Sequence, residues 1–113
     1  MTQTTEIYLK REEITDVQKT VSDMLDRLAT ETKAQGEDNY CQVVIQLNED
    51  KETGKEWKMF VYYQDNDLYR YSYQDEDYWD TDFYNSNTRD FMVAKILEEI
   101  KAVDGLQWIA LDF

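Results

Sequence analysis

The chain contains no histidine, no proline and a single cysteine among its 113 residues. Without histidine it lacks the commonest general base, the commonest metal ligand and the usual partner of a serine or cysteine nucleophile. With Cys41 alone it can form neither an internal disulfide nor a cysteine-based metal site. The three glycines stand far apart, which excludes a glycine-rich phosphate loop. We therefore expect no enzyme, no metal and no cofactor.

Basic residues are scarce as well, with 12 Lys and Arg against 25 Asp and Glu, so the formal net charge is −13. Such a field repels nucleic acid and anionic lipid and speeds encounters with basic proteins. No basic stretch followed by an apolar run begins the chain, and no apolar stretch approaches the length of a membrane span. The sequence predicts a cytoplasmic protein that binds neither nucleic acid nor membrane directly.

Disorder is a common outcome for an acidic chain, but disordered chains are poor in aromatic residues and rich in proline. Here 14% of the residues are aromatic, including nine tyrosines, and 42% are apolar. That apolar content is enough to build a core, and the length corresponds to one domain. We predict a single folded domain spanning residues 1–113.

Two segments have the three- and four-residue apolar spacing of amphipathic helices. The first helix is expected to begin after a cap at Thr15, with the apolar stripe Ile14, Val17, Val21, Met24, Leu25 and Leu28. The second is expected to follow a cap at Thr88 and to end at Gly105, with the stripe Met92, Val93, Ile96, Leu97, Ile100 and Val103.

Strand-like alternation occupies most of the remaining chain. The predicted strands are residues 40–48, 56–64 and 68–74, with a final run at 106–113 in which Trp108 or Ile109 turns inward. Residues 5–10 form either an edge strand or a helical turn, and residues 75–87 are expected to be an irregular connection. The order (β)-α-β-β-β-α-β predicts a two-layer α+β fold, with a mostly antiparallel sheet of three to five strands and two amphipathic helices.

The most unusual segment runs from Asp75 to Tyr84, where five acids occupy eight positions and four aromatic residues are interleaved. From Asp65 to Asp82 there are seven acids and one base. Aromatic rings beside charges are typical of protein interfaces, because rings anchor and charges steer. Five carboxylates spread over an extended segment of about 26 Å lie about 5 Å apart, against about 3.4 Å between phosphates along a DNA strand.

We therefore predict a partner-binding site for a basic nucleic-acid-binding protein, such as a Cas or restriction nuclease, in which carboxylates mimic DNA phosphates. Its predicted residues are Asp65, Asp67, Asp75, Glu76, Asp77, Tyr78, Trp79, Asp80, Asp82 and Tyr84.

Other interpretations stay open. An acidic run is often only a solvated loop. An EF-hand counted from Asp75 is excluded because Asp80 and Ser86 stand where Gly and Glu are required, although an irregular weak cation site is not. Two of the many carboxylates could serve an enzyme or a sugar-binding module. The oligomeric state is not determined by the sequence.

A further alternative concerns the aromatic residues of two neighbouring strands, Tyr62, Tyr63, Tyr69, Tyr71 and Tyr73. Alternate tyrosines on a strand most often cover a helix or pair across strands. Exposed, they would form the interface of a toxin-immunity or adaptor protein that binds through its aromatic sheet face.

The size, charge, element order and acidic cluster from Asp75 to Asp82 resemble the small acidic anti-CRISPR proteins of phages and mobile elements. The resemblance implies a non-enzymatic inhibitor that blocks the DNA groove of a Cas nuclease, and it extends to anti-restriction and nuclease-immunity proteins. The chain departs from the α-β-β-β-α order of that class in its final strand-like run, residues 106–113.

Overall fold

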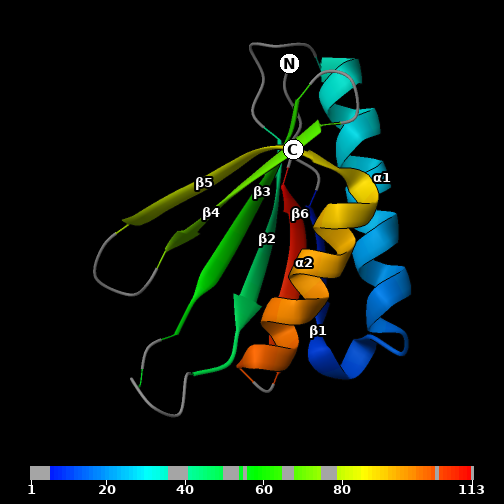
Figure 1. The fold of residues 1–113 in the computed structure, drawn as a ribbon. Helices are drawn as coiled ribbons and strands as arrows, with labels where there is room; N and C mark the ends of the chain where they lie inside the picture. The colour runs from blue at the N-terminus through cyan, green and yellow to red at the C-terminus, as the bar shows by residue number, and fades with distance from the viewer. Residues whose placement is uncertain are drawn as a thin grey trace.

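Two helices cover one face of an antiparallel sheet in the computed structural model, which describes residues 6–35, 41–49, 54, 56–64, 68–74, 79–103 and 105–112 (Figure 1). Along the chain the elements are β1 (Glu6–Lys10), a 3₁₀ turn η1 (Arg11–Glu13), α1 (Val17–Gln35), β2 (Gln42–Leu47), β3 (Lys58–Gln64), β4 (Leu68–Gln74), β5 (Trp79–Thr88), α2 (Arg89–Ala102) and β6 (Leu106–Asp112). The predicted two-layer α+β class is confirmed.

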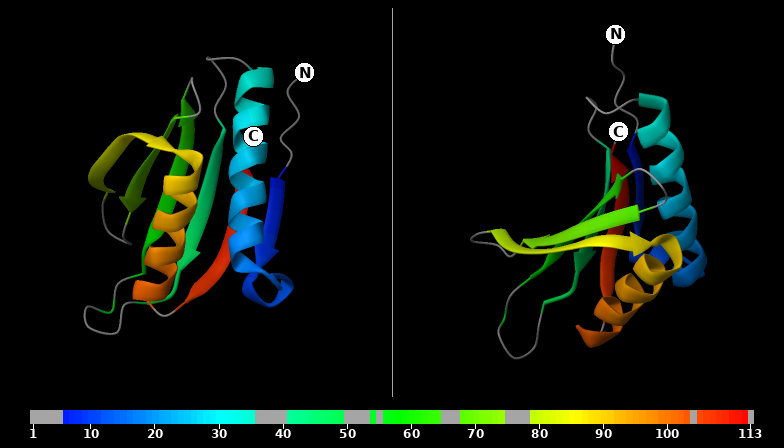
Figure 2. Two further views of the ribbon diagram at one scale, coloured as in Figure 1. Left: turned by 45° about the vertical axis from the view of Figure 1, so that its right-hand side comes forward. Right: turned by 45° about the horizontal axis from the view of Figure 1, so that its top comes forward.

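Within the described residues the sheet has six strands in the order β1-β6-β2-β3-β4-β5, and every neighbouring pair is antiparallel. The last strand in the chain, β6, inserts between β1 and β2, while β1 and β5 form the two edges. The sheet is strongly twisted, so that β4 and β5 cross the direction of β1 and β6 (Figure 2).

The elements follow the predicted order, with one strand more than expected between β4 and α2. We predicted an irregular connection at residues 75–87, and this was wrong for residues 79–87, which belong to β5. The register between β4 and β5 shifts between Tyr69 and Tyr71 and again between Tyr71 and Tyr73. Such bulges add unpaired residues and interrupt the period-two pattern by which a strand is recognised.

Local signals place the helix ends. Thr88 precedes α2, and its hydroxyl accepts a hydrogen bond from the Phe91 amide, so the predicted cap is confirmed. The first helix begins one residue later than expected, because Asp16 rather than Thr15 accepts from the backbone, at 3.1 Å from the Lys19 nitrogen. Beyond α2, Gly105 has a φ of 147°, a conformation that favours glycine, and its amide donates to the Ile100 carbonyl at 2.8 Å.

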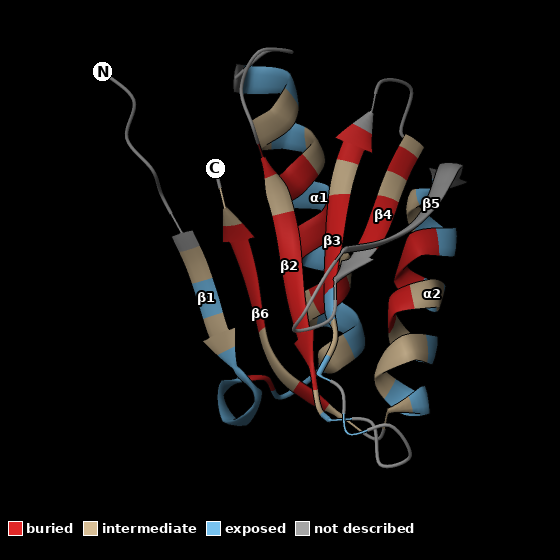
Figure 3. Ribbon diagram, turned by 90° about the vertical axis from the view of Figure 1, so that its left-hand side faces the viewer, coloured by how far each residue is buried: buried red, intermediate tan, exposed pale blue. Residues whose placement is uncertain are grey.

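The core lies between the helices and the sheet face that they cover (Figure 3). Cys41, just before β2, belongs to it. Its strand residues alternate along the strands and include Val43, Ile45, Leu47, Met59, Val61, Tyr63, Tyr69, Tyr71, Ile109 and Leu111. Tyr69 and Tyr71 are 2% and 1% exposed. The Tyr69 hydroxyl donates to the backbone carbonyl of Leu25 in α1 at 3.1 Å, so it joins the sheet to the helix layer.

Replacing Tyr69 with phenylalanine is expected to lower the free energy of unfolding by about 1 kcal/mol, because one buried hydrogen bond is lost while the ring and its packing stay. Urea denaturation followed by circular dichroism measures this difference. Tyr8→Phe, in a strand residue whose side chain is 46% exposed, is the matched control and should change stability less. Equal effects of the two substitutions would contradict the assigned role of the Tyr69 hydroxyl.

Candidate protein-binding site

The helix layer carries no net charge. Each helix holds three acids and three bases, so the net charge of −13 lies entirely outside α1 and α2. Most of these helix charges are paired: Lys19 with Asp23 at 3.0 Å, Arg27 with Glu31 at 3.1 Å and Lys95 with Glu99 at 3.0 Å. Hydrogen bonds to Asp23 and Glu99 raise the pKa of Lys19 and of Lys95.

A further ion pair joins the two helices. Arg89, at the start of α2, donates from Nε to Asp26 Oδ1 at 2.7 Å and from Nη2 to Asp26 Oδ2 at 3.0 Å, and it also donates to Ser22 in α1. This two-point contact raises the pKa of Arg89. The helices therefore carry no net charge and most of their charges are paired, so the excess of negative charge that would attract a basic partner lies in the rest of the chain.

Six of the predicted site residues lie outside the described residues: Asp65, Asp67, Asp75, Glu76, Asp77 and Tyr78. The other four, Trp79, Asp80, Asp82 and Tyr84, lie on β5, an edge strand of the sheet. In the register with β4, Trp79 pairs with Gln74, Asp80 with Tyr73 and Tyr84 with Tyr71.

Two acidic segments, residues 65–67 and residues 75–78, are joined in the chain to the two ends of β4. Gln64 and Leu68, which flank residues 65–67, pair at one end, and Gln74 and Trp79, which flank residues 75–78, pair at the other. From Leu68 to Gln74 the strand rises about 20 Å. A partner that reaches both flanks must therefore follow β4 over a length equal to about six phosphate steps of a DNA strand.

The tyrosine ladder is not an exposed platform where its side chains are described. Tyr63, Tyr69 and Tyr71 are buried beneath the helices, and the rings of Tyr63 and Tyr69 pack edge to face at 5.4 Å. Lysines of the helices lie over two of the rings, Lys33 at 5.4 Å from Tyr63 and Lys95 at 6.0 Å from Tyr71. The structural role that alternate tyrosines favour is confirmed for these three residues.

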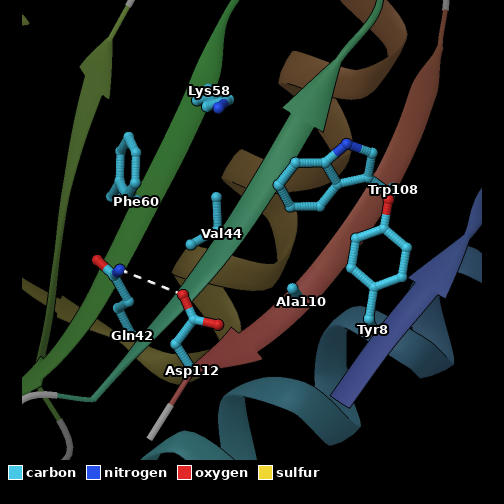
Figure 4. A pocket seen from close by; sticks show the side chains of 8 residues that line it. All are labelled: Tyr8, Gln42, Val44, Lys58, Phe60, Trp108, Ala110 and Asp112. Carbon is cyan, nitrogen blue, oxygen red and sulfur yellow. Dashed lines mark hydrogen bonds between the residues drawn. The ribbon is translucent and has the colours of Figure 1, made fainter. Parts of the chain in front are cut away.

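The opposite face of the sheet, which the helices do not cover, contains a groove that sequence reasoning missed (Figure 4). It has a volume of about 330 Å³ and is lined by Tyr8, Gln42, Val44, Lys58, Phe60, Trp108, Ala110 and Asp112. Ile109 is fully buried on the helix side, so the neighbouring Trp108 lies on the open face. In the sequence, the only indication of this groove was the alternating pattern of the first and last strands. These strands are neighbours in the sheet because β6 lies between β1 and β2.

Two observations on the described residues concern catalytic and metal chemistry. Cys41 is 5% exposed on the helix side of the sheet, and burial raises the pKa of its thiol, which disfavours the nucleophilic thiolate. Among the residues with described positions, no three acidic or cysteine side chains come close enough together to hold a metal ion. No helix of the described ranges is long and apolar enough to cross a membrane.

Comparison with protein-family models, curated proteins and solved structures gave no significant match.

Proposed function

We propose that this protein is a non-enzymatic, cytoplasmic inhibitor that occupies the basic nucleic-acid channel of a nuclease or another nucleic-acid-binding protein, in the manner of anti-CRISPR or anti-restriction proteins. The observation that carries the proposal is the separation of charge: a neutral, ion-paired helix layer and a net charge of −13 outside it. Arginines and lysines that line a nucleic-acid channel would therefore be attracted to the segments of the chain outside the two helices.

The strand β5 gives this charge a spacing suited to phosphate sites. Asp80 and Asp82 are two residues apart on β5, which corresponds to at most about 6.7 Å of strand rise, because a bulge lies between Asp80 and Tyr84. Two phosphate steps along one DNA strand measure about 6.8 Å. Asp80 pairs with Tyr73 of β4, whereas Asp82 lies in the bulge between the pairings of Asp80 and Tyr84.

Recovery of a partner under controlled salt tests the proposal. The tagged protein is incubated with lysate of a nuclease-bearing host at low salt, and the bound fraction is challenged with duplex DNA and, separately, with about 0.5 M salt, where screening shortens to a few ångströms. We expect a nucleic-acid enzyme that both treatments release and that the pure protein then inhibits. A partner that survives both treatments would contradict DNA mimicry.

A second candidate is a toxin-immunity or adaptor protein that binds through an aromatic sheet face. The open-face groove favours it, because Tyr8 is 46% exposed there and its ring lies 5.2 Å from that of Trp108. The face differs from the tyrosine ladder first considered, whose described side chains are buried. Apolar contacts are not screened, so this candidate predicts a complex that high salt does not dissociate.

A further inference from the structure

The open-face groove is built on one row of residues across four strands. Tyr8 of β1 pairs with Ala110 of β6, Ala110 pairs with Val44 of β2, and Val44 pairs with Phe60 of β3. Directly opposed residues share a sheet face, so these four side chains lie together. Val44, Ala110 and Phe60 are buried although no helix covers them, and they form an apolar floor (Figure 4).

The two ends of the groove carry opposite charges. At one end Lys58 stands beside Trp108, with its ammonium 5.9 Å from the centre of the indole ring. At the other end Asp112 accepts a hydrogen bond from the Gln42 amide at 3.4 Å, which orients the carboxylate. Along β6 the distance from Trp108 to Asp112 corresponds to about 13 Å of strand.

The lining chemistry favours a side chain that is apolar along its stem and cationic at its tip. The apolar floor suits an aliphatic stem, and the Asp112 carboxylate suits a positive head. Lys58 repels a cation at the far end, so the head is directed to Asp112.

We infer that this groove is a recognition site for an arginine side chain presented by a basic protein. The inference rests on the proposed function only in taking the partner to be basic. The stem of the arginine packs over Val44 and Ala110, and its guanidinium makes charge-assisted hydrogen bonds to Asp112. A second copy of this chain is a poor occupant, because two molecules of net charge −13 repel each other.

The test is an NMR titration of the full ¹⁵N-labelled protein with the blocked peptide acetyl-Ala-Arg-Ala-amide. The control peptide is identical except that neutral citrulline replaces the arginine. We expect the arginine peptide to shift the Trp108 indole resonance and the backbone amides of Val44 and Ala110. The citrulline peptide should bind about tenfold more weakly, because it lacks the charge that strengthens the hydrogen bonds to Asp112.

Two pairs of variants separate the groove from general electrostatic attraction. Asp112→Asn should weaken arginine-peptide binding about tenfold, whereas Glu98→Gln, the same change of charge on the exposed face of α2, should leave it unchanged. Lys58→Glu should tighten binding severalfold, and Lys101→Glu, also on α2, should have a much smaller effect. Equal effects within either pair, or shifts absent from the groove, would overturn the inference.

Failure of this inference and failure of the proposed function give different results. Groove shifts that require Asp112 support the arginine site even if no partner is released by DNA. Suppose instead that DNA releases a nuclease partner and that this partner binds wild type and Asp112→Asn with the same affinity. The inhibitor proposal then stands, and the groove is not the site for an arginine of that partner.

Discussion

Replacing Asp77, Asp80 and Asp82 together with lysine is expected to abolish binding to the basic partner and to leave the circular dichroism spectrum unchanged. The substitutions alter the net charge by six units within one short stretch of chain, so contacts that attract the channel become repulsive. Affinity measured by isothermal titration calorimetry should fall on the order of a hundredfold or more, since like charges in an interface cost several kcal/mol.

A variant with the same total change of charge controls for the field of the whole protein. Glu12, Glu56 and Glu98 are exposed, do not belong to β5, and form no ion pair among the side chains that the structure describes. Lysine at these three positions should slow association with only a small loss of affinity. An equal loss of affinity in both triple variants would show that the total charge decides binding. An unaltered affinity of the Asp77, Asp80 and Asp82 variant would show that these residues are not the binding site.

The second prediction compares two neighbouring valines on opposite faces of β2. Val43→Ala is expected to lower the free energy of unfolding by about 2 to 3 kcal/mol, because Val43 is fully buried between sheet and helices and the deletion leaves a cavity. Val44→Ala removes the same atoms from the floor of the groove, where neighbouring side chains and water can fill the space that is left. Its cost should be about 1 kcal/mol.

Chemical denaturation of both variants, with the slope of the transition checked for constancy, measures the difference. Binding then provides an independent readout, since Val44→Ala reshapes the groove and should reduce the shifts caused by the arginine peptide, whereas Val43→Ala should not. A Val44 variant as unstable as the Val43 variant would mean that the groove floor is as closely packed as the core.

Elements with strong local signals were predictable from the sequence. Thr88 caps its helix through its own hydroxyl and the Phe91 amide, an interaction that spans three residues. Alternation predicted the strand that contains Val43 and Ile45, and both side chains are buried on one face of it, because successive side chains of a strand point to opposite faces. The absence of histidine and the excess of acids are likewise properties of composition, which folding does not change.

Features that depend on pairing between distant segments were not predictable. β5 escaped recognition because bulges in its pairing with β4 break the period-two pattern. The groove brings Tyr8 beside Trp108, a hundred positions further along the chain, and that contact exists only because β6 inserts between β1 and β2. Nor could the sequence show that Asp26 and Arg89 neutralise each other across two helices.

The sequence by itself determined the α+β class, the Thr88 cap of α2, the alternating core strands and the acidic character, since each follows from residue type or from neighbours a few positions away. Only the tertiary structure decided which sheet face stays open, that the described tyrosines of the ladder are buried, and that the helix charges are largely paired. The physical reason is that strand order and register are set by contacts between segments far apart in the chain, and local periodicity carries no record of them.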